Sequence, residues 1–150
     1  MAPTVCIVDT NVIVSGFMGR RSNSPPERIL DAMLDGSLLY VMSGQLLDEY
    51  SSVLRRPQIA RRHGEADDVI DRLLTHLVAN AIWREPSVTV NALDRGDNHL
   101  WALLATWPRA LLATGDRLLL TNPPPGASVV SSREFVDAFL PPPERRENGM

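Results

Sequence analysis

The chain of 150 residues contains no lysine, so all 15 of its basic residues are arginine. This absence excludes a P-loop lysine, a Schiff-base lysine and a serine–lysine pair as functional groups. It also argues against a phosphate-receiver domain, which normally uses a lysine. A GC-rich gene explains the preference for arginine, although arginine also suits bidentate contacts with phosphate.

Cysteine, long apolar runs and excess positive charge are also scarce. The single Cys6 cannot form an internal disulfide, so we expect it to be a small core residue. No apolar run reaches the length of a membrane span, and no basic stretch precedes an apolar one at the N-terminus. We therefore expect a cytoplasmic protein without a membrane partner. The net charge of −3 does not by itself indicate nucleic-acid binding.

Short apolar runs alternate with helical patterns along the chain. The expected strands are residues 5–8, 38–42, 81–84, 110–113 and 128–130. The expected helices follow capping signals at Ser24 (with Glu27), Ser43, Asp94 and Ser131, with a further amphipathic helix over 66–79. This alternation predicts an α/β fold, a three-layer α/β/α sandwich around a parallel sheet of about five strands. We expect one domain over residues 1–140 and a disordered, proline-rich tail over 141–150.

Four acidic residues are placed where such a fold can bring them together. Asp9 and Asp116 each follow an expected strand, and ligands bind at the carboxyl ends of parallel strands. Helical geometry turns Glu49 toward the sheet and Asp48 toward solvent. The same geometry turns Asp97 inward at the start of its helix. Converging carboxylates without lysine favour a site for a hard metal ion.

Each acid also has a purely structural interpretation. Asp9 and Asp116 could form turns, Glu49 could be a solvated border residue, and Asp97 could belong to a helix cap. Their order and convergence, rather than any one of them, indicate metal-dependent phosphodiester chemistry.

Several segments resemble a known family. Residues 8–16, Val-Asp-Thr-Asn-Val-Ile-Val-Ser-Gly, resemble the opening of PIN-domain ribonucleases. In the same order, residues 43–57, 94–98 and 111–119 resemble the second acidic helix, the Asp-Pro-Asp-Asp-Asn segment and the fourth-strand signature of one branch. That branch is described as toxin components of toxin–antitoxin systems, and the resemblance covers about residues 5–140. Gly96 stands where many relatives carry a further aspartate, and Arg95 where they carry proline, so one nearby carboxylate is missing.

The resemblance implies a five-stranded parallel sheet, Mg²⁺ or Mn²⁺ as cofactor, and cleavage of single-stranded RNA. The catalytic and metal-binding acids would be Asp9, Glu49, Asp97 and Asp116, with Asn11 and Thr114 in support. Glu49 would hold a second metal ion or orient the attacking water. No histidine is needed as a base, so we expect His63, His76 and His99 on the surface or on helix faces. The helical angle of His99 points away from the side of Asp97.

Contacts with RNA would come from arginine and tryptophan side chains. Arg20 and Arg21 follow the first strand, and Arg55 and Arg56 follow the Glu49 helix, although the second pair could equally be solvated. Trp83 and Trp107 are further candidates for stacking on bases, whereas Trp101 is expected in the core.

Two other functions and two protein partners follow from the same residues. A phosphatase of the haloacid-dehalogenase kind also begins with an aspartate at a strand end, but needs a second one where this chain has Asn11. A non-catalytic PIN-like interaction module is the other alternative. A toxin role would imply an antitoxin protein as partner. A homodimer could use the helix over 66–79, whose apolar face could equally be core.

Overall fold

A computed structural model of the protein describes residues 4–19, 22–86 and 95–140. It contains one sheet of five parallel strands: β1 (Val5–Val8), β2 (Leu39–Met42), β3 (Ile82–Trp83), β4 (Leu111–Ala113) and β5 (Ser128–Val130). Their order across the sheet is β3-β2-β1-β4-β5. The α/β class and the parallel sheet are confirmed. The bounds of β1 and β5 match the expected ones, and the other strands are shorter by one or two residues.

The central strand explains why this topology forms. Cys6, Ile7 and Val8 are completely buried, as expected for a strand covered on both faces. Cys6 is the small core residue that the sequence predicted, and burial raises the pKa of its thiol to about 12. The chain leaves β1 toward β2 on one side and later places β4 on the other side. The switch point therefore lies between the carboxyl ends of β1 and β4, where open α/β sheets bind ligands.

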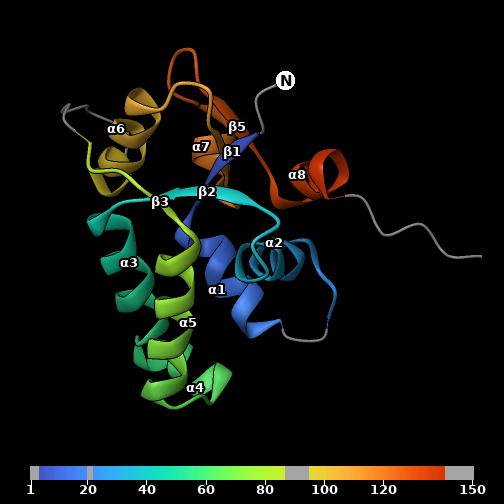
Figure 1. Ribbon diagram of the computed structural model, residues 1–150, viewed down its shortest axis with the longest axis vertical. Helices are drawn as coiled ribbons and strands as arrows, with labels where there is room; N and C mark the ends of the chain where they lie inside the picture. The colour runs from blue at the N-terminus through green and yellow to red at the C-terminus, as the bar shows by residue number, and fades with distance from the viewer. Residues whose placement is uncertain (1–3, 20–21, 87–94, 141–150) are drawn as a thin grey trace, which may run out of the picture.

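Helices cover both faces of the sheet. They are α1 (Thr10–Met18), α2 (Pro25–Leu34), α3 (Gly44–Leu54), α4 (Pro57–His63), α5 (Asp67–Asn80), α6 (Asn98–Thr106), α7 (Arg117–Thr121) and α8 (Ser132–Phe139). A short 3₁₀ turn, η1 (Arg95–Asp97), precedes α6. In Figure 1, α1, α2, α3 and α5 lie below β2, and α6 lies above it. The sequence did not predict α1, α4 or α7.

Helix caps follow the sequence signals with one exception. Ser43 and Ser131 cap α3 and α8, and Ser131 forms the expected capping box with Glu134. Ser24 caps α2, but the predicted box with Glu27 is wrong. The Ser24 amide donates to Ser22 Oγ, whereas the Glu27 carboxylate accepts from residues before the cap, including the Ser22 amide at 2.8 Å. The Glu27 carboxylate therefore accepts hydrogen bonds from the loop before α2 and not from the amide of the cap residue Ser24.

The apolar face of α5 forms part of the core. Ile70 and Leu77 are almost fully buried, and the Tyr40 hydroxyl donates to the Leu77 carbonyl at 2.6 Å. Val78 stays 37% exposed at the edge of this face. The predicted tail over 141–150 lies outside the described residues. Within the described ranges, no helix is long and apolar enough to cross a membrane.

Candidate active site

Asp9 lies at the junction of β1 and α1, and hydrogen bonds hold both of its carboxylate oxygens. Val8 pairs with Ala113 in the sheet, and the Asp9 amide donates to the Ala113 carbonyl at 2.9 Å. Asp9 is only 5% exposed, and its carboxylate caps α1 because Oδ1 accepts from the Thr10 amide at 2.8 Å. Oδ2 accepts from the Thr114 hydroxyl at 2.7 Å. Asp9 thus follows β1 as the N-cap of α1, and the same hydrogen bonds hold its carboxylate in one orientation.

The segment after β4 mirrors this arrangement. Thr114 is fully buried, and its hydroxyl accepts from the Asp116 amide at 3.0 Å. Asp116 caps α7 by accepting from the Leu118 amide at 2.9 Å. Asn11 joins the two strand ends, because its Oδ1 accepts from the Gly115 amide at 2.8 Å and its Nδ2 donates to Asp9 Oδ2 at 3.3 Å. Asn11 and Thr114 therefore occupy the supporting positions that the sequence predicted.

Glu49 reaches the same place from α3. The next residue, Tyr50, is fully buried and donates its hydroxyl to the Val8 carbonyl, which fixes α3 against the end of β1. The Glu49 carboxylate accepts from the Thr10 hydroxyl through Oε1 at 2.7 Å and lies 2.7 Å from His99 Nε2 through Oε2. Neither of these two partners was assigned a role from the sequence.

Together these residues line one open pocket of about 350 Å³. Its lining residues are Asp9, Thr10, Asn11, Val14, Ser15, Glu49, Val53, Arg56, Asp97 and Asp116. Asp97 is half-buried at the N-cap of α6, the position at which negative charge is favoured. The structure therefore brings together all four predicted acids, from four different segments of the chain.

The carboxylates of this pocket differ in their electrostatic environments. Burial raises the pKa of Asp9, and the charges of Glu49 and Asp116 raise it further, against the hydrogen bonds from Thr114 and Thr10. The hydrogen bond from His99 lowers the pKa of Glu49, with smaller lowering contributions from Thr10 and Arg56 and an opposing one from burial. Asp9 is thus held among like charges, whereas Glu49 is stabilised as an anion.

The pocket suits a hard cation in donor chemistry but does not form a closed metal cage. All of its candidate ligands are oxygen atoms, which Mg²⁺ and Mn²⁺ prefer. Over residues 4–19, 22–86 and 95–140, no group of three or more histidine, cysteine or acidic side chains is arranged to hold a metal ion. Mg²⁺ is usually bound by one or two carboxylates together with water and substrate phosphate, so an open set of acids is compatible with it.

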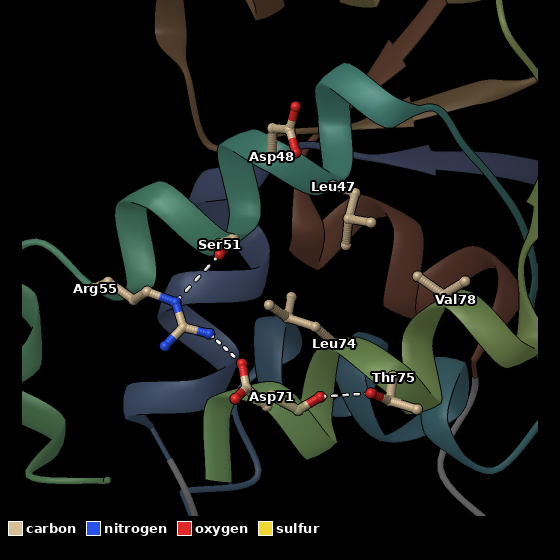
Figure 2. Close-up of a pocket in the computed structure, with 8 residues that line it drawn as sticks. All are labelled: Leu47, Asp48, Ser51, Arg55, Asp71, Leu74, Thr75 and Val78. Carbon is tan, nitrogen blue, oxygen red and sulfur yellow. Dashed lines mark hydrogen bonds and ion pairs between the residues drawn. The ribbon is translucent and has the colours of Figure 1, made fainter. Parts of the chain in front are cut away.

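Of the two predicted RNA-binding arginines that the structure describes, Arg56 lines the acidic pocket and Arg55 does not. Arg55 instead belongs to a groove between α3 and α5, shown in Figure 2. It donates to Ser51 Oγ at 3.2 Å and forms ion pairs with Asp67 and Asp71. Arg55 thus forms structural ion pairs away from the acidic pocket, and its contact with RNA stays a prediction. Arg20 and Arg21 lie outside the described residues, as does the predicted helix cap Asp94.

Asp48 lines that same groove and not the acidic pocket. It is exposed, as the helical geometry predicted, whereas Glu49 turns inward. The neighbours Asp48 and Glu49 thus lie on two separate surfaces, the groove and the acidic pocket.

The prediction that His99 lies on the surface and points away from the side of Asp97 was wrong. His99 is 5% exposed and turns toward Glu49, not toward the surface. Because η1 is a 3₁₀ turn and α6 begins only at Asn98, an angle counted from Asp97 with α-helical spacing gives the wrong direction. His76 is exposed, as expected, and half-buried His63 accepts the Glu65 amide at 2.9 Å.

The tryptophans divide between surface and core. Trp83 is 43% exposed, and half-buried Trp107 has the guanidinium of Arg84 5.3 Å from the centre of its ring. Trp101 is half-buried and packs against the hydrophobic core, as expected. None of the three lines the acidic pocket.

Comparison with known proteins agrees with this geometry. A family model described as the PIN domain matches residues 5–118 of the chain. The match includes the four acids, their supporting residues and His99. The protein therefore belongs to the PIN-domain family, whose members are generally nucleases that use divalent metal ions. No curated protein matches the chain.

Proposed function

We propose that this protein is an endoribonuclease that depends on Mg²⁺ or Mn²⁺ and hydrolyses single-stranded RNA. The observation that carries the proposal is the convergence of Asp9, Glu49, Asp97 and Asp116 on one pocket at the switch point of the sheet. Clustered acids with a raised pKa at Asp9 oppose folding stability and are typical of functional sites.

The chain supplies the groups that such a reaction needs. Asp9, Asp97 and Asp116 would hold the cation, with Thr114 and Asn11 fixing the carboxylate of Asp9. A bound Mg²⁺ or Mn²⁺ supplies charge stabilisation at the scissile phosphate and lowers the pKa of a water molecule. Glu49 would orient the attacking water or bind a second ion. Arg56 on the pocket wall would bind an RNA phosphate.

Features of the pocket disfavour the two alternatives. In a haloacid-dehalogenase-like phosphatase, the second acid acts from the position of Asn11, but the Asn11 side chain is used to join the ends of β1 and β4. A non-catalytic module has no need for four acids in one pocket. A toxin role, an antitoxin partner and a homodimer are further proposals, and they rest on the resemblance to one branch of the family.

A cleavage assay on mixed single-stranded RNA tests this proposal. We expect cleavage with Mg²⁺ or Mn²⁺, none with excess EDTA, and losses of about 100-fold or more in Asp9→Asn, Asp97→Asn and Asp116→Asn. Asp71→Asn, in the groove between α3 and α5, is the matched control and should cleave normally. Undiminished cleavage in EDTA, or by all three pocket variants, would refute the proposal. Hydrolysis of a small phosphoester by a wild type that leaves RNA intact would favour the phosphatase.

A further inference from the structure

Buried polar side chains are rare in this protein, and nearly all of them serve the pocket. In the described part of the chain they are Asp9, Thr10, Ser43, His99 and Thr114. Ser43 caps α3, and the remaining four either are a pocket carboxylate or contact one. His99 is the member of this set to which the proposed reaction gives no role. Burying an imidazole is costly unless it is hydrogen-bonded, so its contact with Glu49 needs an explanation.

The surroundings of the His99 ring determine which nitrogen carries the proton. Nε2 lies 2.7 Å from Glu49 Oε2, and the side chain is 3% exposed. Nδ1 is buried and has no hydrogen-bond partner among the described residues. A proton on Nδ1 would leave an unsatisfied buried donor and point the Nε2 lone pair at a carboxylate. The proton therefore sits on Nε2, and His99 donates to Glu49.

This hydrogen bond completes a clamp on the Glu49 carboxylate. Thr10 donates to Oε1 and His99 to Oε2, each at 2.7 Å, so one donor holds each oxygen. The Glu49 side chain is still 34% exposed and would otherwise be free to change rotamer. Thr10 belongs to α1, Glu49 to α3 and His99 to α6, so the clamp joins three helices at the pocket.

The position of His99 links a second acid to the clamp. Asp97 is the N-cap of α6, two residues before His99, and lines the pocket with Glu49. The hydrogen bond across to α3 therefore also sets the start of α6 relative to Glu49.

We propose that His99 is a positioning residue, which holds Glu49, and with it the start of α6, in the orientation that the pocket needs for metal binding and turnover. The inference rests on the proposed function. It assigns His99 neither to the metal ion nor to the reacting atoms. A residue of this kind, which orients a ligand, typically changes metal affinity or activity by about 10- to 100-fold when it is removed.

The test compares variants that keep or remove the donor. His99→Leu removes it, whereas His99→Gln can present an amide N–H in place of Nε2–H. We expect His99→Leu to weaken Mn²⁺ binding to the RNA-free protein about 10-fold and to lower kcat about 10-fold, with KM for RNA nearly unchanged. His99→Gln should recover both to within about threefold of the wild type. Calorimetry with Mn²⁺ alone and cleavage kinetics give the two readouts.

A double-mutant cycle separates positioning from a general structural role. Because His99 acts through Glu49, His99→Leu should cause no further loss when Glu49 is already glutamine. Full additivity of the two losses would overturn the proposal, as would equal losses in His99→Leu and His99→Gln.

Three further outcomes complete the test. If His99→Leu does not fold, His99→Phe fills the space of the ring without a donor and replaces it. Failure of both apolar variants to fold, together with an inactive His99→Gln, would make His99 a core residue and overturn the proposal. If the wild type and His99→Leu cleaved RNA at equal rates, the positioning role of His99 would be refuted and the proposed nuclease activity would stand. A wild type that neither binds Mn²⁺ nor cleaves RNA would refute the nuclease and the positioning role with it.

Discussion

Helix α3 separates two clusters of acids that the protein treats in opposite ways. On one side, Arg55 in the groove of Figure 2 forms ion pairs with Asp71, which also lines that groove, and with Asp67. On the other side, Glu49 faces Asp9 and Asp116, and these two charges help to raise the pKa of Asp9. The first cluster is exposed and shares an arginine, whereas the second is partly buried and dominated by like charge.

The difference separates a structural use of charge from a functional one. Exposed ion pairs add at most about 1 kcal/mol to stability and need no further explanation. Carboxylates gathered in a pocket work against folding, and a fold retains them where ligand binding or catalysis uses them. Among the described residues that line the acidic pocket, Arg56 is the one basic side chain, and a single arginine cannot neutralise four acids.

The sharpest test of this comparison uses adjacent residues of α3. Glu49→Gln removes the clamped carboxylate, and we expect it to lower metal-dependent RNA cleavage by about 10- to 100-fold. Asp48→Asn changes an exposed residue of the groove and should alter cleavage less than about twofold. Steady-state kinetics at saturating Mg²⁺ measure both variants. If Asp48→Asn were the damaging change, the groove and not the acidic pocket would be the active surface.

Arg55 and Arg56 provide a second adjacent pair. Arg56→Gln should weaken RNA binding several-fold and reduce the salt dependence of log affinity by about 0.7, as expected for one lost phosphate contact with a single strand. Arg55→Gln should leave RNA binding unchanged and lower the unfolding free energy by less than about 1 kcal/mol. Fluorescence anisotropy over a range of salt concentrations and urea unfolding separate the two effects. If log affinity depended equally on salt concentration in the two variants, Arg56 would not be an RNA contact.

Elements with a strong local signal were predictable from the sequence, and those whose signal depends on context were not. Strand β1 is uniformly apolar, and α8 starts with a capping box, so both were found with nearly their observed bounds. Helix α1 was missed because it directly continues the apolar run and is rich in β-branched residues, which favour strands. Helix α4 has no capping side chain and begins at Pro57, and proline can mark either the end of one helix or the first turn of the next.

The site was predictable at the level of its acids but not of their partners. Asp9 and Asp116 are placed by strand ends, and Glu49 by a helix phase that starts at a clear cap. Thr10 and His99 depend on how three helices approach one another, and no local pattern encodes that approach. His99 was further obscured by the 3₁₀ turn before α6, which shifts the phase of the helix.

The smallest expected effect concerns stability without substrate or metal. The pKa of Asp9 is raised above its ordinary value of 3.8, first by burial and then by the charges of Glu49 and Asp116. A carboxyl group with a raised pKa binds its proton more tightly in the folded state. The contribution of Asp9 to the free energy of unfolding therefore falls as the pH rises from 3.8 through its folded-state pKa, and then stays level. At neutral pH, ionised Asp9 thus makes the metal-free fold less stable.

Asp116→Asn should relieve part of this cost, because it removes one of the charges that raise the pKa of Asp9. Asparagine caps helices about as well as aspartate, so the hydrogen bond from the Leu118 amide can be kept. In EDTA near pH 7, we expect the variant to melt roughly 1–3 °C above the wild type and to gain less from added Mg²⁺. The difference should shrink toward zero as the pH falls to 3.8, where protonation of Asp9 removes the repulsion. Asp71→Asn, which breaks an ion pair with Arg55, should instead melt slightly below the wild type. Thermal melts between pH 4 and pH 7.5 measure both variants. If Asp116→Asn melted below the wild type by the same amount at every pH, Asp116 would act only as a helix cap.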